Sequence, residues 1–467
     1  MSARVLLSGS DLLVARGERR VLRGVDFALS EGEVVALVGV NGSGKTTLLE
    51  TLAGLHRMGE GRVERHDLGV SEIVRDSAGQ RGDIRGFGLS LQSNAICGDE
   101  TVSERVATAC RVAGRALDDN SLKSVLDEWG LAHRADDRVA KLSGGLRRRV
   151  AVLSALVPAV LSPEPTCVLL DEPSEGLDEA SRGLLVGWLR ALAARGHGIL
   201  IATHDPEMVA ACDRVASISE AGQISSEDRA SQIAETSLRE PSDSDQSDEI
   251  FSWAIRLERR NPIDTIGRGV PAIIALLLAF TLSTDIPRTS ENYDLLAALI
   301  LAPAFISAVV APALIKRLAE ERTGDWWRAM IGSRSRLMFS LSGASLLLPL
   351  PLFAISWLVL VRDLDLALST IDILLLILIG TTVIDLSVAA VALHLLVGDL
   401  SRPSAAAGIL LQVVLVWPFL QLSSALSSIM AAEGGLELAL GTPLADLLIA
   451  ILTVILIWAF AVVIPED

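Results

Sequence analysis

The chain has 467 residues, half of them hydrophobic, and a formal net charge of −16 at pH 7. So acidic a composition offers no basic surface for nucleic acid, and we expect no nucleic-acid partner. The four cysteines have no close pair in sequence, which argues against a zinc site or a disulfide framework and for a reducing compartment. They are Cys97, Cys110, Cys167 and Cys212.

Composition divides the chain into three parts. Residues 1–219 are mixed and charged, as in a globular domain, whereas 250–467 are dominated by apolar runs. Between them, 220–249 holds nine acidic residues and two arginines. That segment has too little apolar surface to offset its ordering entropy, so we expect an acidic flexible linker. No signal peptide precedes the first strand, which predicts a cytosolic N-terminus.

The residues from Gly39 to Thr46 form the P-loop pattern G-x-x-x-x-G-K-[ST]. A buried strand is predicted before it, over 33–38, and a helix directly after it. Small residues let backbone N–H groups turn toward a polyphosphate at the positive end of that helix. We therefore expect a nucleoside triphosphate site with Lys45 on the β- and γ-phosphates and the Thr46 hydroxyl on Mg²⁺. Its residues are Gly39, Asn41, Gly42, Ser43, Gly44, Lys45, Thr46 and Thr47.

Four shorter patterns follow the P-loop, each weak alone. They are Gln92 after a short apolar strand, Ser143-Gly144-Gly145 before a helix, Asp171-Glu172 ending one buried strand and His204 ending another. In this order and spacing, residues 4–219 closely resemble the ATP-binding cassette of ABC transporters. The resemblance implies an α/β P-loop NTPase fold, followed here by an all-α transmembrane domain.

The resemblance also implies a role for each of these residues. Asp171, with Thr46 and Gln92, would hold Mg²⁺. Glu172 would deprotonate the attacking water, and Gln92 would help to position that water. His204 would contact the γ-phosphate of ATP.

Ser143, Gly144 and Gly145 would cap the γ-phosphate bound to another subunit, and Asp178 would cross to that subunit. Since one chain carries one P-loop and one such cap, a second copy is the expected partner, in a homodimer.

Two positions depart from the family pattern. Leu146 stands where glutamine is usual, and Arg16 stands where an aromatic residue usually stacks on adenine. A guanidinium can also stack on a base.

The second half predicts about six membrane spans, because a bilayer core of about 30 Å takes about 20 helical residues. The runs are Gly269–Thr284, Leu295–Ile315, Leu337–Val361, Ile371–Val397, Pro403–Ala432 and Leu447–Ile464. Lysine and arginine concentrate after the second span, which places the cassette and both termini in the cytoplasm of a multi-pass plasma-membrane protein. Residues 251–260 predict an amphipathic helix at the lipid surface.

Three features of this half bear on function. Asp385 and His394 lie within the fourth run, where intramembrane charge is a functional hypothesis, and we favour Asp385 as facing the bundle interior. Trp326 and Trp327 favour interfacial anchoring over a heme motif. We expect the basic loop 316–336 to dock on the cassette near Gln92.

Short loop patterns in this half resemble the heme exporter membrane subunit of cytochrome c maturation. They are Glu258-Arg259-Arg260, Asp264-Thr265-Ile266-Gly267-Arg268, Glu321-Arg322-Thr323-Gly324 and Ser333-Arg334-Ser335-Arg336.

Two functions stay open. One is a homodimeric ATP-driven exporter, of heme or for cytochrome c maturation. The other is a mechanotransmitter that remodels or releases a periplasmic partner protein without transport. Intact Lys45, Glu172 and His204 argue against a third, an inactive scaffold.

Overall fold

The protein is described by a computed structural model and divides into two compact units. The described residues are 4–67, 70–82, 87–115, 117–229, 249–287, 289–309, 317–332, 334–346, 349–361, 384, 386–393, 405–431 and 442–463. The first unit comprises Met1–Glu249 together with Arg317–Leu337. The second unit comprises Ile250–Lys316 and Met338–Asp467. We refer to Arg317–Leu337, which comes from the second half of the sequence, as the 317–337 segment.

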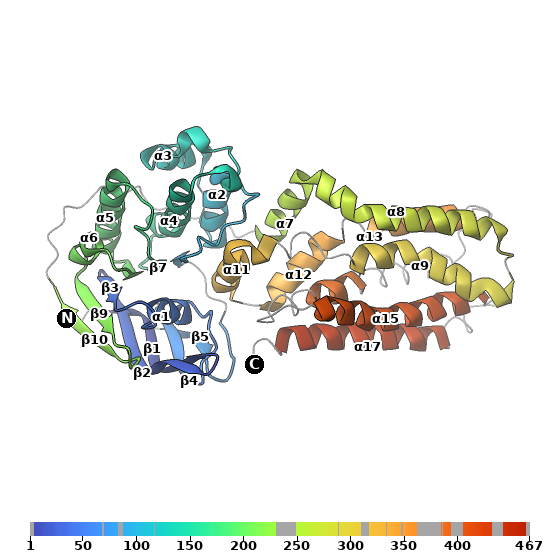
Figure 1. Cartoon of the computed structure of the whole chain (residues 1–467), viewed down its shortest axis with the longest axis horizontal. Coiled ribbons are helices and arrows are strands. Elements are labelled where there is room, and N and C mark those ends of the chain that lie inside the picture. Colours follow the sequence, from blue (N-terminus) through green and yellow to red (C-terminus); the bar gives the residue numbers. More distant parts are fainter. Residues whose placement is uncertain are drawn as a thin grey trace. The chain divides into compact units, whose positions relative to one another are not determined.

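A six-stranded sheet organises the first unit, in the order β10-β9-β3-β8-β7-β6 (Figure 1). Its strands are β3 (Val34–Val38), β6 (Gly88–Ser90), β7 (Cys167–Asp171), β8 (Gly198–Ala202), β9 (Arg214–Ile218) and β10 (Ile224–Asp228). All pairs from β9 to β6 are parallel, and every residue of β7 and β8 is buried. The carboxyl ends of parallel strands share one edge, which is where ligands bind in such sheets. The P-loop, Gln92, Glu172 and His204 all follow strand ends at that edge.

A second, antiparallel sheet has the order β2-β1-β4-β5. Its strands are β1 (Val5–Arg16), β2 (Arg19–Ser30), β4 (Glu60–Asp67) and β5 (Val70–Asp76). The helices before residue 229 are α1 (Lys45–Leu52), α2 (Val102–Val112), α3 (Asp119–Glu128), α4 (Gly144–Val160), α5 (Glu179–Ala194) and α6 (Pro206–Ala210), with short 3₁₀ turns at Ala132–Arg134 and Val139–Lys141. A core of buried aliphatic side chains joins α4 and α5 to β7 and β8, with Trp129 and Trp188 edge to face at 5.5 Å.

Strand β10 corrects the predicted domain boundary. Residues Ile224–Asp228 pair antiparallel with β9 and complete the large sheet, so the linker predicted over 220–249 does not begin at 220. The acidic side chains of β10 face solvent at the sheet edge, where charge is tolerated. The central part of the predicted linker, 230–248, lies outside the described residues. At its far end, Glu249 already begins helix α7 (Glu249–Arg260).

The 317–337 segment packs within the first unit, as the docking prediction requires. It holds a 3₁₀ turn, η4 (Glu320–Arg322), helix α11 (Thr323–Ile331) and the start of α12 (Arg334–Ser345). Trp326 and Trp327 are 1% and 0% exposed, and the Arg105 guanidinium of α2 lies 3.7 Å from the Trp326 ring centre. The prediction of interfacial anchoring was therefore wrong for this tryptophan pair, because both rings are enclosed by protein.

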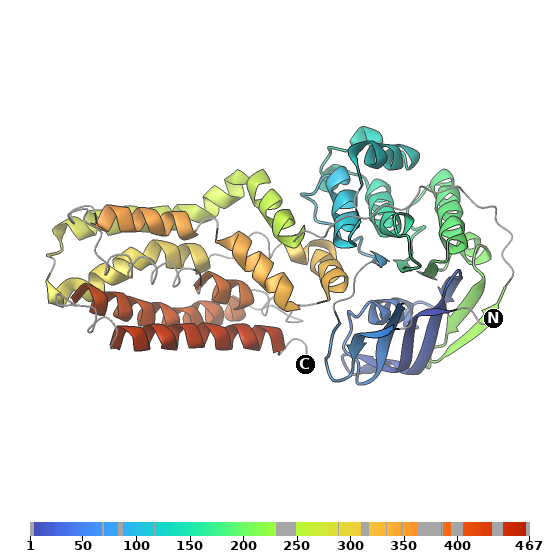
Figure 2. The same ribbon diagram turned by 180° about the vertical axis from the view of Figure 1, so that it is seen from behind.

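All regular secondary structure in the described part of the second unit is helical. After α7 come α8 (Pro262–Asp285), α9 (Tyr293–Val309), α12, α13 (Pro349–Val361), α15 (Ala405–Ala431) and α17 (Thr442–Val463), with η3 at Ser290–Asn292. Helices α15 and α17 lie side by side in both views (Figure 2). Ile250, Trp253 and Leu257 form the buried face of α7, so its amphipathic pattern is confirmed, whereas its place at a lipid surface stays a prediction.

Helix length and composition test the predicted spans. In the part of the chain that the structure describes, one stretch, Leu337–Ser356, is long and apolar enough to cross a membrane, which alone is weak evidence. Shorter apolar helices occur at Gly269–Leu282, Tyr293–Ser307 and Leu448–Ala459. The count of six spans stays a prediction. Asp385 and His394 lie outside the described residues.

Candidate functional site: a nucleotide pocket at the sheet edge

The P-loop connects β3 to α1 through a chain of glycines with left-handed backbone. Gly39, Gly42 and Gly44 have φ values of 153°, 80° and 115°, a region that side chains rarely adopt. The Lys45 side chain is 8% exposed, and its Nζ donates to the carbonyl oxygen of Gly39 at 2.8 Å. The loop therefore holds the Lys45 ammonium group at the N-terminus of α1, where helix N–H groups favour an anion.

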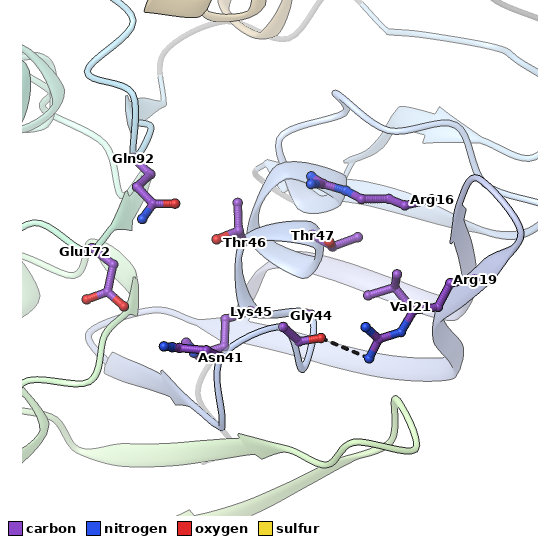
Figure 3. Close-up of a pocket in the computed structure, with 11 residues that line it drawn as sticks. Arg16, Arg19, Val21, Asn41, Gly44, Lys45, Thr46, Thr47, Gln92 and Glu172 are labelled. Atoms are coloured by element: carbon purple, nitrogen blue, oxygen red, sulfur yellow. Dashed lines mark hydrogen bonds between the residues drawn. The ribbon is translucent and has the colours of Figure 1, made fainter. Parts of the chain in front are cut away.

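A pocket of about 500 Å³ opens over this loop (Figure 3). In this view Gln92 and Glu172 lie on one side, Arg16 and Arg19 on the other, and Lys45 and Thr46 between them. The lining residues are Arg16, Arg19, Val21, Asn41, Gly42, Gly44, Lys45, Thr46, Thr47, Gln92 and Glu172. Nine of these eleven residues were singled out from the sequence, and Arg19 and Val21 were not. The Arg19 guanidinium donates to the Gly42 carbonyl at 3.3 Å.

Asp171 meets the requirements of a magnesium ligand. Burial raises its pKa to about 6, against the lowering effect of the Thr46 hydroxyl. Its side chain is enclosed, and no described group donates to either carboxylate oxygen with ordinary hydrogen-bond geometry. A buried carboxylate beside a threonine hydroxyl is an oxygen donor set that suits Mg²⁺. Gln92 is exposed on the same pocket wall and can supply a further oxygen.

Glu172 and His204 form a pair next to that site. The His204 Nδ1 lies 2.9 Å from a Glu172 carboxylate oxygen, and this contact raises the pKa of His204 above its usual value. Glu172 is 9% exposed and has a φ of +46°, a strained backbone for a residue with a side chain. Glu172 can accept a proton, and the His204 side chain that contacts it is 73% exposed.

Arg148 is a site residue that the sequence did not reveal. Its buried guanidinium donates to the Leu91 carbonyl at 2.7 Å, to the Asn94 amide at 3.1 Å and to the Glu172 carbonyl at 2.8 Å. One side chain of α4 thus fixes the loop that carries Gln92 against the strand end that carries Glu172. Three adjacent arginines follow Leu146, and nothing in their pattern shows which one is buried.

The Ser143 cap lies apart from this pocket. Ser143 caps α4 by accepting from the Leu146 N–H at 3.4 Å, and Ser143 and Gly144 are exposed. None of the described pocket-lining residues belongs to this cap. It is packed instead beside the loop of Asp178, which accepts from Arg149 of α4 at 2.6 Å. The exposed helix start is therefore available to an anion from outside this chain.

Comparison with known proteins agrees with this geometry. Residues 22–175 match the family model for "ABC transporter". The lipoprotein-releasing system ATP-binding protein LolD of Saccharophagus degradans is 36% identical over 190 residues, which cover 40% of this chain and 80% of that protein. The chain belongs to the ABC transporter family. Its cassette binds ATP with Mg²⁺, and the protein is an ABC ATPase.

The relatives named MacB match a smaller share of their own length. The macrolide export ATP-binding/permease protein MacB of Hyphomonas neptunium is 34% identical over 275 residues, 56% of this chain and 42% of that protein. A dimeric bacterial ABC transporter cassette of known structure covers 48% of this chain and 98% of that cassette, with 24% identity and a TM-score of 0.40. A likeness at that score adds nothing to the assignment. The chain spans about two fifths of the MacB relative.

Arg16 lines the pocket, but its guanidinium is already engaged. It donates to a Glu50 carboxylate oxygen at 2.7 Å and lies 2.8 Å from the His56 Nε2. The Arg16 side chain is still 48% exposed. Stacking on a base, as the sequence suggested, would require the guanidinium to divide its contacts between a nucleotide and Glu50.

Proposed function

We propose that this chain is one half of a homodimeric ATP-driven exporter, with cassette and permease in one polypeptide. The observation that carries the proposal is the 317–337 segment, which belongs to the second half of the sequence and is folded into the ATP-binding unit. Arg317 pairs with Asp99 at 2.9 Å, and Arg147 pairs with Glu321 at 2.8 Å. Such contacts would let a change in the cassette move the helices that follow the segment.

Within the ATP site we assign roles by geometry. Lys45 and the P-loop N–H groups would bind the β- and γ-phosphates, and Asp171, Thr46 and Gln92 would hold Mg²⁺. The metal would neutralise charge that develops on the phosphate oxygens during transfer. Glu172 would take a proton from the attacking water. His204, held by Glu172, would hydrogen-bond to the γ-phosphate.

The exposed Ser143 cap supports a dimer in which each chain completes the pocket of the other. Asp178, 60% exposed on its side chain, would lie at the same interface. Mixed dimers test this arrangement. Chains with Ser143→Arg and chains with Lys45→Ala should each be inactive alone, and mixing them should restore activity, because one of the two sites is then intact. Full activity of the Ser143→Arg homodimer would contradict the arrangement in trans.

The second unit supports a location in the cell membrane. In the described part of this unit many large apolar side chains are exposed, including Leu277, Leu278, Leu452, Ile455 and Leu456. A lipid bilayer would cover them, in a bundle of about six spans with the cassette in the cytoplasm. The relatives are named for lipoprotein release and macrolide export, which favours an amphipathic cargo. Heme as cargo, with a cytochrome-maturation partner, rests on the loop patterns alone.

A mechanotransmitter is the second candidate, because one relative is named for releasing lipoproteins. Proteoliposomes with the cassette facing outward separate the two functions. An exporter accumulates a labelled amphiphile in the lumen when ATP is added, and Glu172→Gln abolishes this. Suitable probes are hemin, a macrolide and a lipidated peptide. ATP hydrolysis without accumulation of any probe would favour the mechanotransmitter and contradict the exporter.

A further inference from the structure

Glu50 is a buried carboxylate between the nucleotide pocket and the 317–337 segment. It lies on α1, five residues after Lys45, and its side chain is 0% exposed. One carboxylate oxygen accepts from Arg16 at 2.7 Å and lies 2.6 Å from the His56 Nε2. The other oxygen accepts from the Arg322 guanidinium. All of these residues belong to the first unit. The Glu50 carboxylate therefore contacts both Arg16, which lines the pocket, and Arg322, which lies in the 317–337 segment.

The partners of Glu50 keep it ionised. Burial by itself would raise the pKa of this carboxyl, but hydrogen bonds from His56 and Arg322 outweigh burial and lower the pKa to about 2. Removing one partner from a buried ionised group is strongly unfavourable unless another takes over its charge. Arg16 and His56 share one oxygen of Glu50 and Arg322 binds the other, so this carboxylate divides its contacts between the pocket side and the segment.

Arg322 is also held in a conformation that it would leave if released. Glu321 and Arg322 have φ values of 45° and 63°, so two successive residues with side chains occupy the left-handed region. Such strain persists only where surrounding contacts impose it. Here the contacts are the Arg322 bonds to Glu50 and Asp325 and the Glu321 bond to Arg147. The turn thus has a docked state that depends on ion pairs.

We propose that Glu50 is a positioning residue that couples occupancy of the ATP pocket to docking of the 317–337 segment. The proposal rests on the ATP site proposed above and adds a path of contacts from that site to the 317–337 segment. When a nucleotide draws the Arg16 guanidinium toward its base, Glu50 loses one counterion and depends more on Arg322. Arg322 is then held more tightly, and η4 and α11 are fixed against the cassette.

This coupling has a direction that a merely structural ion pair would lack. Nucleotide binding should tighten α11, and by linkage a docked α11 should tighten nucleotide binding by the same factor. Loss of Arg16 should imitate nucleotide, because Glu50 then depends on Arg322 at all times. The Arg147–Glu321 pair offers a matched control, since it also holds η4 but contacts no residue of the pocket wall among those described.

The test is amide hydrogen exchange of α11 in the full-length chain in lipid nanodiscs, with and without Mg²⁺ and the non-hydrolysable analogue AMP-PNP. In the wild type we expect nucleotide to slow exchange of Thr323–Ile331 by about fivefold or more, the lower end of typical coupling factors. In Glu50→Gln and Arg322→Gln the nucleotide effect should vanish. In Arg16→Gln exchange should be slow without nucleotide, and in Glu321→Gln the nucleotide effect should persist.

Nucleotide affinity, measured with a fluorescent ATP analogue, separates this proposal from the one it rests on. If the wild type binds nucleotide but α11 exchange does not respond, the coupling is wrong and the ATP site stands. An equal nucleotide effect in wild type and Glu50→Gln would also overturn the coupling. Failure of the wild type to bind nucleotide would overturn both. Should Glu50→Gln not fold, Arg322→Gln and Arg16→Gln decide, since they approach the carboxylate from opposite sides.

Discussion

The two units of this chain expose different kinds of surface. Among the described residues, two large hydrophobic side chains are exposed in the first unit, Val40 and Val70, against twenty-two in the second. The first unit buries its aliphatic residues around a parallel sheet and places charges on its surface, as proteins in water do. The second unit turns leucine and isoleucine outward along α8 and α17. The two units thus present surfaces of different kinds, and the proposed membrane location would give the second unit a lipid environment.

Function can be inferred from the two units by different routes. In the first unit, particular side chains at strand ends define a chemical site, so substituting one of these side chains should change the rate of ATP hydrolysis. In the second, no single described side chain defines a site, and what matters is the environment that its surface requires. The following changes test this contrast, from the largest expected effect to the smallest.

The largest effect should come from Glu172→Gln. Removing the general base should lower ATP turnover by about 10²–10⁴-fold, because the amide cannot accept the proton of the attacking water. Steady-state phosphate release by the reconstituted protein measures it. Glu164→Gln is the control, since that residue is exposed, lies before β7 and does not line the pocket, so it should leave turnover unchanged. Undiminished turnover in Glu172→Gln would remove the catalytic role from this strand end.

An arginine on the outward face of α8 tests the environment of the second unit. Leu277 is 60% exposed, and in a bilayer Leu277→Arg should destabilise the protein by about 3 kcal/mol. On a surface in water the same change should cost less than about 0.5 kcal/mol. Val70→Arg, at a position 61% exposed in the first unit, provides that comparison. Thermal unfolding in nanodiscs measures both, and equal effects would break the contrast between the units.

Acid should destabilise the first unit through His197. Burial lowers the pKa of His197 to about 4 from its ordinary 6.5, and its Nδ1 accepts from the Thr166 N–H at 3.1 Å. As pH falls from about 6.5 to 4, the unfolded chain binds a proton that the folded chain does not, so up to about 3 kcal/mol of stability is lost in that window. His197→Asn keeps an acceptor without titrating.

Thermal unfolding at pH 7 and pH 4.5 measures this loss. The wild type should lose more stability over that interval than His197→Asn. His133→Asn serves as the control, because His133 is exposed and should leave the pH dependence of the wild type intact. The assignment to His197 fails if His197→Asn and the wild type respond to acid alike.

The smallest effect should come from the Arg147–Glu321 pair. Its side chains are 34% and 35% exposed, and such pairs contribute about 1 kcal/mol or less. A double-mutant cycle with Arg147→Ala and Glu321→Ala should give a coupling energy in that range, which salt should reduce. A coupling energy well above it would mean that the segment depends on this pair rather than on buried Trp326.

Local patterns determined the ATP site in advance. The P-loop, Asp171-Glu172 and His204 each lie at or just after the end of a buried strand, and parallel strands end at one edge, so strand order alone brings them together. The starts of α1 and α4 followed from the P-loop and from the Ser143 cap for the same reason. In each case neighbouring residues decide the backbone conformation, and so the sequence suffices.

Only the tertiary structure decided which charges meet. Glu50 and Arg322 are 272 residues apart, and neither belongs to a pattern that predicts the other. Burial of Arg148 rather than its arginine neighbours, enclosure of Trp326 by Arg105, and addition of β10 to the sheet likewise depend on distant elements. Long-range contacts are set by the packing of whole helices and sheets, whereas a sequence motif records only what adjacent residues require.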